Sequence, residues 1–171
     1  MKKLLLAFVL CLIISPALAE QRIVFTRSDG AITVRHLPSG ASPQDFTDAI
    51  QHAIDSGEAV NIPIAVDQTA MPTVRTFRNA WRQSNGAVSV DMPTARGIHA
   101  EHIARAHAAE IARVKTEERS ERLKGNTTKA DAHAATVTAL EALDLNVLAM
   151  QIANAPNPTA LEAIWPVDVP R

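Results

Sequence analysis

Residues 74–90 have the sequence VRTFRNAWRQSNGAVSV, which is the most distinctive stretch of the chain. Its Asn85-Gly86 dipeptide suits the positive φ angles of a two-residue hairpin turn. Apolar residues flank the turn at alternating positions. We therefore expect a β-hairpin here, in which Trp81 lies opposite Val90.

The same stretch holds the candidate interaction residues. Residues 74–80 fit a helical turn with Phe77 and Trp81 on one side and the arginines on the other. Aromatic rings beside arginines can stack on nucleobases. We favour the alternative that the rings are buried in the core and the arginines face solvent. If this stretch binds a protein partner, the candidate interaction residues are Arg75, Arg78, Trp81 and Arg82.

The residues before this stretch predict a small antiparallel sheet. Residues 22–26 and 31–35 are rich in β-formers, and the Asp-Gly dipeptide between them suits a tight turn. Residues 59–66 are a third candidate strand. Because Pro63 lacks a backbone donor, that strand is expected at an edge of the sheet.

One helix is expected within this sheet region. Ser42 can cap it, Pro43 suits its first turn, and Asp45 lies near the positive end of its dipole. Gly57 ends it. Its apolar residues recur at helical spacing on one stripe, formed by Phe46, Ala49, Ile50, Ala53 and Ile54.

The C-terminal half predicts helices. A long helix is expected from its cap at Asp91 to about Lys124, with a wholly charged end that meets water or a partner. A second helix is expected over residues 128–154, and a short third one after Pro158. Two long helices with a short connection form an antiparallel hairpin. It would pack on the sheet or on another copy of the chain.

The second long helix has one broad apolar face. We expect it to be formed by Val137, Leu140, Leu143, Val147 and Met150, and widened by Leu145, Leu148 and Ile152. Asp144 is the polar residue inside this run. It either faces solvent or specifies the register between helices.

The fold class expected is therefore α+β: a small antiparallel β-hairpin sheet with one helix, followed by a C-terminal antiparallel helical hairpin. The corresponding regions are a signal peptide at 1–19, a small α+β region at 20–90 and a helical hairpin region at 91–171.

Residues 1–19 have the three parts of a bacterial export signal. Two lysines precede an apolar run from Leu4 to Ile14, and Ala17-Leu18-Ala19 stands before Glu20. Cleavage is expected after Ala19, which places the protein in the periplasm or the medium with no membrane attachment. An uncleaved anchor is the alternative, but the apolar run is shorter than the ~20 residues that span a bilayer. Cys11, inside that run, lacks the small residues of a lipidation site.

Composition excludes several functions. Cys11 is the single cysteine, so the processed chain has no cysteine nucleophile and no disulfide. Loss of Lys2 and Lys3 leaves 15 basic and 18 acidic residues, a formal charge of −3, which argues against nucleic-acid binding. Residues 40–44 lack the second glycine of a serine-nucleophile elbow. We expect a non-enzyme without a cofactor.

Histidines are the best candidates for a metal site. His99, His102 and Glu110 lie near one helical face and could ligate zinc. The paired-histidine zinc helix, however, spaces its ligands at i and i+4, and a structural zinc needs about four ligands. We therefore expect no metal, with His99 and His102 solvated and His107 half-buried with one hydrogen-bond partner.

Four segments of the chain carry a resemblance to a known family: residues 22–30, 75–81, 90–96 and 161–166. In these segments the chain resembles an uncharacterised family encoded in phages and prophages, often near tail genes. The resemblance implies a tail-assembly or virion-associated protein and carries over no catalytic residue. The export signal departs from that family, and a phage-derived domain reused in the cell envelope would reconcile the two.

Two functions remain open from the sequence. One is an exported, non-catalytic structural or interaction protein that binds a partner or itself, for which the resemblance implies a phage origin. The other is a periplasmic protein that binds a small ligand or a metal.

Overall fold

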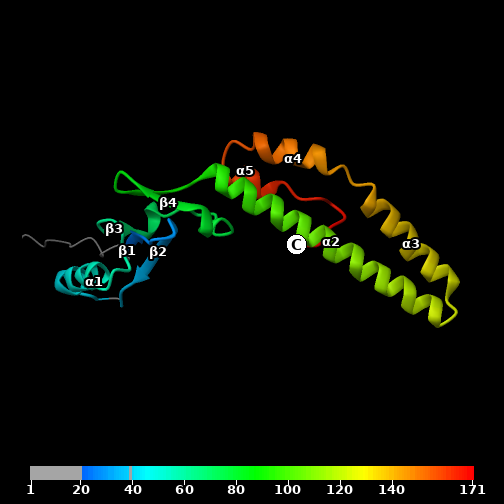
Figure 1. Ribbon diagram of the computed structural model, residues 1–171, viewed down its shortest axis with the longest axis horizontal. Coiled ribbons are helices and arrows are strands. Elements are labelled where there is room, and N and C mark those ends of the chain that lie inside the picture. The colour runs from blue at the N-terminus through cyan, green and yellow to red at the C-terminus, as the bar shows by residue number, and fades with distance from the viewer. Residues whose placement is uncertain (1–20, 39) are drawn as a thin grey trace, which may run out of the picture.

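The computed structural model describes residues 21–38 and 40–171, so the signal expected at 1–19 lies outside the described residues. Figure 1 shows an elongated molecule: a small sheet with one helix at one end, and a helical arm that extends away from it. The α+β fold class expected from the sequence is confirmed.

The first sheet has three antiparallel strands in the order β2-β1-β3. β1 (Gln21–Thr26) pairs with β2 (Ile32–His36) through the predicted hairpin, and β3 (Ile64–Asp67) pairs with the other edge of β1. Pro63 ends the segment that leads into β3, and β3 is an edge strand as predicted. β1 is therefore the central strand.

β1 is buried on both faces, because successive side chains of a strand point to opposite sides. Ile23 and Phe25 pack against α1 (Pro43–Asp55). Val24 faces the other way and packs against Trp81 in the cluster that joins the two sheets. The sheet is therefore the middle layer between α1 and the second hairpin.

α1 begins at the predicted cap. The Asp45 backbone N–H donates to the Ser42 hydroxyl at 3.2 Å, and the Ser42 backbone N–H donates to the Asp45 carboxylate at 2.7 Å. This reciprocal arrangement is a capping box. It lowers the pKa of Asp45, because both the backbone and the side chain of Ser42 donate to the charged carboxylate.

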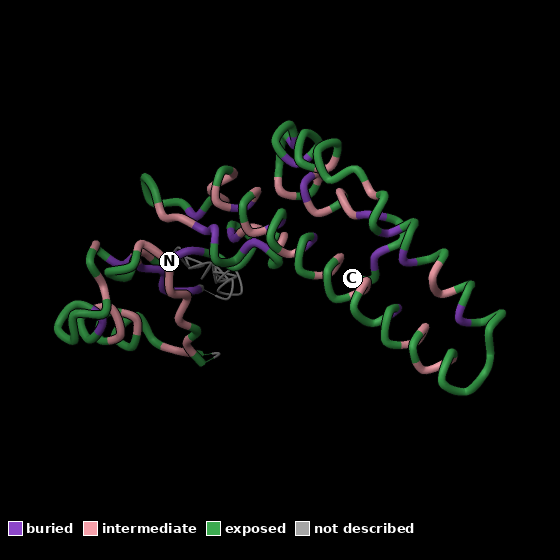
Figure 2. The backbone as a smooth tube through the Cα atoms, turned by 45° about the vertical axis from the view of Figure 1, so that its right-hand side comes forward, coloured by how far each residue is buried: buried purple, intermediate pink, exposed green. Residues whose placement is uncertain are grey.

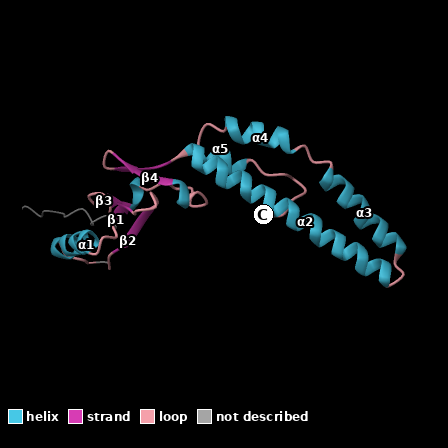
Figure 3. Ribbon diagram, in the orientation of Figure 1, coloured by secondary structure: helices cyan, strands magenta, loops and turns pink. Residues whose placement is uncertain are grey.

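The second hairpin also forms as predicted. β4 (Trp81–Ser84) and β5 (Ala87–Val90) are antiparallel, with Trp81 opposite Val90. Asn85 and Gly86 have φ angles of 51° and 77°, which the two-residue turn requires. Figure 3 shows this hairpin between the first sheet and the beginning of the helical arm.

The arm consists of α2 (Met92–Leu123) and α3 (Thr127–Glu141), which lie side by side and antiparallel (Figure 1). α2 begins at Asp91, whose carboxylate accepts the Thr94 backbone N–H at 3.1 Å, as the predicted cap requires. The end of the arm is charged but internally paired: Arg122 contacts Glu118 on its own helix and Asp131 on α3.

The single helix expected over residues 128–154 is wrong. α3 ends at Glu141, and α4 (Leu145–Asn154) begins after a bend of 47°. Asp144 caps α4 by accepting the backbone N–H groups of Asn146 and Val147, at 2.9 and 3.3 Å. An aspartate can thus satisfy helix-terminal donors locally, which competes with continuation of the preceding helix.

The bend changes which side chains α4 buries. Leu148 and Ile152 pack inward against α2 and α5 (Pro158–Ala163). Val147 and Met150, expected on the same apolar face as Leu148 and Ile152, are 43% and 59% exposed. They lie on the other side of the helix because α4 no longer continues the face of α3.

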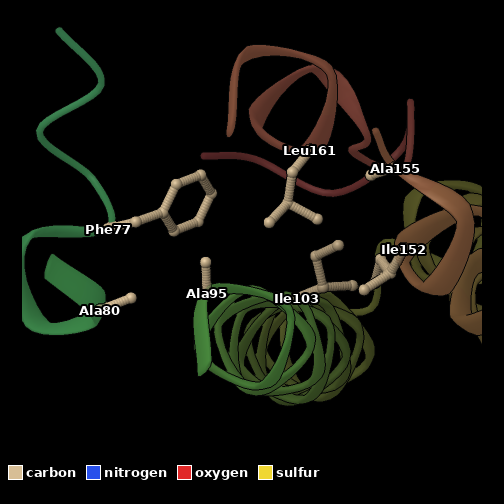
Figure 4. Close-up of a cluster of buried hydrophobic side chains, with 7 residues drawn as sticks. All are labelled: Phe77, Ala80, Ala95, Ile103, Ile152, Ala155 and Leu161. Carbon is tan, nitrogen blue, oxygen red and sulfur yellow. The ribbon is translucent and has the colours of Figure 1, made fainter. Parts of the chain in front are cut away.

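One cluster of apolar side chains ties the two halves together (Figure 4). Phe77, from the segment before the second hairpin, points toward Ala95 and Ile103 of α2 and Leu161 of α5. Ile152 closes the cluster from α4. The chain between Phe77 and Trp81 thus passes from the core of the helices to the core of the sheets.

Candidate functional site

Trp81 is the centre of the contact between the two sheets. It is fully buried among Val24, Val66, Met71 and Val88. The guanidinium carbons of Arg75 and Arg78 lie 5.1 and 6.0 Å from the centroid of its ring. Both arginines are exposed, but they lie over the ring, a geometry that attracts cations to the face of an indole.

The predicted arrangement of this segment is therefore wrong in one respect. Phe77 and Trp81 were expected on one side of a helical turn, with the arginines opposite. The turn is a short 3-10 helix, Arg78–Ala80, after which the backbone becomes extended at Trp81. The two rings consequently enter different clusters, and the arginines follow Trp81.

Arg82, the remaining arginine of the predicted set, is not part of this group. Its Nη1 donates to the backbone carbonyls of Asn79 and Trp81, at 3.1 and 2.9 Å. Arg82 thereby holds the backbone of the turn before the hairpin. The structure brings Arg75, Arg78 and Trp81 together and leaves Arg82 as a structural residue.

A small cavity of about 150 Å³ lies beside this group. It is lined by Arg22, Val34, His36, Gln68, Met71 and Arg75. Arg22 is 7% exposed, and its Nη2 donates to the Gln68 Oε1 at 2.5 Å. Two guanidinium groups and an imidazole therefore border one cavity.

Of the residues that border the cavity, only Arg75 was singled out from the sequence. Arg22 did carry a signal: it shares the period-2 face of Val24, and a charged residue at an inward position of a strand is uncommon. No such signal in the sequence marks His36 or Gln68. Their placement depends on the strand order, which sequence periodicity does not determine.

The histidine predictions have mixed outcomes. His99, expected to be solvated, is 2% exposed. Its Nε2 donates to the Ile164 carbonyl at 2.6 Å, and its ring lies between Phe77 and Trp165, with centroids at 5.6 and 6.0 Å. His99 is buried because residues 164–169 fold back along α2, a contact between distant parts of the chain.

His107 is placed as predicted. It is half-buried, and its Nε2 donates to the Leu140 carbonyl at 2.8 Å, near the last turn of α3. This bond is one of the polar links between α2 and α3. His102 is half-buried.

The three metal candidates do not form a coordination site. The Nε2 of His99 donates a hydrogen bond to the Ile164 backbone carbonyl. Glu110 pairs with Arg113, whose Nη2 lies 2.5 Å from its Oε1, and hydrogen bonding from Arg113 lowers the pKa of Glu110. Within residues 21–38 and 40–171, no group of three or more histidine, cysteine, aspartate or glutamate side chains is placed to hold a metal ion.

The outer face of α4 is the second candidate surface. Figure 2 shows most of this helix as exposed, and its residues include no charged side chain. Leu145, Val147 and Met150 are 44%, 43% and 59% exposed. Val147 and Met150 are three residues apart and therefore share one side of the helix, and an exposed pair of large apolar side chains is a candidate binding surface. The sequence pattern placed these residues on the apolar face of one continuous helix, so it did not predict this surface.

Among the described helices, none is by itself long and apolar enough to cross a membrane; α3 and α4 meet that test only as a bent pair, by length and composition. No protein-family model, curated protein or solved structure matches this chain.

Proposed function

We propose that this chain is an exported, non-catalytic interaction protein that binds a protein partner through the outer face of α4. The observation that carries the proposal is the exposure of Val147 and Met150, one helical turn apart, on a helix without charged residues. Burying such side chains on binding contributes about 25 cal/mol per Å² of apolar surface removed from water.

The size of this face favours a grooved partner over a second copy of the chain. α4 has 10 residues and is therefore about 15 Å long, at ~1.5 Å per residue. A stable dimer needs roughly 800 Å² of surface from each subunit. Two short helices that cross each other bury less than this, whereas an apolar groove contacts the exposed face of the helix along its length and buries more of it.

The charged end of the arm supports this choice of surface. Arg113 pairs with Glu110 and Glu117, and Lys124 pairs with Glu121, so these charges are matched within the chain. Exposed ion pairs of this kind contribute little energy. A partner that bound there would have to displace them, while α4 offers apolar surface directly.

Export and phage origin belong to the same proposal and rest on the sequence. The pattern of residues 1–19 supports cleavage and release into the periplasm or medium. The resemblance of four segments to a phage and prophage family supports a virion-derived domain that now serves as a binding module in the cell envelope. The lack of a nucleophile motif supports a non-catalytic role.

Intact-mass measurement of the protein recovered outside the cytoplasm tests export. The expected product begins at Glu20. A product that retains Met1 or carries an acyl group on Cys11 would contradict this part of the proposal.

Site-specific photo-crosslinking tests the binding surface. A photoreactive amino acid at Met150 should give a discrete adduct with a different protein in producing cells. The same group at Ala135, which is exposed on α3, is the matched control and should give none. Val147→Asp should abolish the adduct without changing the circular dichroism spectrum. An adduct at twice the chain mass, or equal adducts from both positions, would refute a grooved partner at α4.

A further inference from the structure

We infer that Asn85 is a self-modification site, where the chain forms a succinimide with Gly86 that then hydrolyses to isoaspartate or aspartate. The reactants are the chain itself and one water molecule. This inference does not depend on the partner proposed for α4, because Asn85 lies in the turn of the β4–β5 hairpin, in the other half of the molecule.

The reaction joins two groups that are neighbours in the chain. The backbone nitrogen of Gly86 attacks the Asn85 Cγ, so a C–N bond forms and closes a five-membered ring. The bond from Cγ to Nδ2 breaks, and Nδ2 leaves as ammonia with the proton that Gly86 gives up. Water then opens the ring at one of its two carbonyl carbons and returns a proton to the Gly86 nitrogen. Opening at Cγ yields aspartate, and opening at the backbone carbonyl yields isoaspartate.

Both reacting groups are open to solvent. Asn85 and Gly86 are exposed. Apart from its two chain neighbours, no described residue lies within 4 Å of the point where a Cβ on Gly86 would stand, so the Gly86 nitrogen is unshielded. The hydrogen bond that closes a β-turn joins residues i and i+3, which here are Ser84 and Ala87. The turn therefore does not use the Gly86 N–H for this bond.

The backbone of the turn can hold the ring while the hairpin stays paired. Among the described residues, Asn85 is the one residue other than glycine with a positive φ, and with Gly86 it forms a type I′ turn. Ring closure brings the Gly86 nitrogen into line with the Asn85 Cβ, which for an L-residue sets ψ at about −120°. That ψ, together with a positive φ, belongs to the first central residue of a type II′ turn. Both turn types match the twist of the flanking strands, and glycine accepts either sign of φ.

The two products affect the hairpin differently. Aspartate keeps the length of the backbone and suits a two-residue turn as asparagine does. Isoaspartate directs the chain through the side-chain carbon, which adds one atom to the backbone of the turn. Because the turn fixes the register of a hairpin, the change reaches the pair of Trp81 with Val90 at the other end of the same ladder. Isoaspartate should therefore weaken the contact between the two sheets, where Trp81 is buried.

Incubation of the purified, folded protein in mildly alkaline buffer, followed by peptide mapping, tests the inference. Base promotes the reaction, because the Gly86 nitrogen attacks after it loses its proton. Mass spectrometry should find NH₂ replaced by OH at Asn85, and an isoaspartate methyltransferase should label the product. Asn126 is the matched control in the same sample: it is exposed, but Thr127 follows it and its φ is −82°. Conversion at Asn85 should be at least tenfold faster than at Asn126.

The chain denatured in urea gives the reference rate for the same reaction. Since the turn can hold the ring, the rate at Asn85 in the folded protein should stay within tenfold of that reference. A greater slowing in the folded protein would show that the hairpin blocks ring closure, and it would overturn the inference.

Two variants separate the modification from the turn. Asn85→Gly keeps a dipeptide that suits the type I′ turn but has no side-chain amide, so it should give no product at this position. Asn85→Asp has the charge of the aspartate product and should unfold at the same urea concentration as the parent. The isoaspartate form, separated by chromatography, should unfold at a lower urea concentration than both. Equal conversion at Asn85 and Asn126, or an isoaspartate form as stable as the parent, would also overturn the inference.

Discussion

Replacing Trp81 with alanine tests whether this ring holds the two sheets together. The ring is fully buried among apolar side chains from β1, β3, the segment that follows β3, and β5. Alanine would leave a cavity at the centre of that contact and remove the surface over which Arg75 and Arg78 lie. The helices would keep their own cluster around Phe77.

The expected magnitude follows from two opposing effects. Truncating a buried tryptophan costs roughly 3–5 kcal/mol. Within the described residues, however, the Trp81 Nε1 has no hydrogen-bond partner, and removing a buried unsatisfied donor returns part of that cost. We therefore expect a loss of about 3 kcal/mol in the free energy of unfolding. For a chain of this size that lowers Tm by about 6–12 °C.

Urea titration monitored by circular dichroism measures this loss, and Trp81→Phe is the matched control. Phenylalanine keeps an aromatic ring and has no N–H, so it should cost less than about 1.5 kcal/mol. A loss below about 1 kcal/mol for Trp81→Ala would show that the ring does not hold the sheets together. An equal loss for both variants would show that the smaller ring of phenylalanine does not replace the indole in this contact.

His99→Ala should lower the free energy of unfolding, measured in urea, by roughly 2–3 kcal/mol, because a backbone carbonyl loses its buried donor. His102→Ala should cost less than about 1 kcal/mol, and equal losses would contradict the burial of His99. Asp144→Ala should cost about 1 kcal/mol in the same assay, with Asp144→Asn close to neutral because asparagine also caps; no difference between them would contradict the cap. The hydrogen bond from Thr94 lowers the pKa of Asp91, so its stabilisation is present above about pH 4 and lost as pH falls through the lowered pKa. Asp91→Asn should therefore flatten the acid limb of a pH–stability profile, and an unchanged limb would refute this. EDTA should leave the thermal melting curve unchanged; a fall in Tm that one equivalent of zinc restores would instead reveal a metal site.

Local signals in the sequence predicted much of the sheet half. The Asn85-Gly86 turn, the Ser42 cap and the two hairpins each depend on residues close together in the chain, and each forms as expected, including the pairing of Trp81 with Val90. The cap at Asp91 belongs to the same group. Such features are set by turn and capping chemistry, which neighbouring residues determine.

The errors arose where distant parts of the chain meet. His99 was assigned to solvent because nothing near it in the sequence shows that residues 164–169 would cover it. Asp144 was read as one polar residue in a continuous helix, although an aspartate inside an apolar run also fits a new N-terminus. The cavity beside Trp81 is lined by residues from β1, β2 and two later segments. Sequence periodicity does not show which of these segments meet, so it could not predict the cavity.

The length of the arm has a hydrodynamic consequence. α2 has 32 residues, which makes it about 48 Å long at ~1.5 Å per residue. A compact chain of about 150 residues has a radius of gyration of only about 15 Å. The monomer therefore experiences more friction than a sphere of equal mass and should elute early from a sizing column, as a dimer would. Light scattering or sedimentation velocity, which separate mass from shape, will assign its true molecular weight.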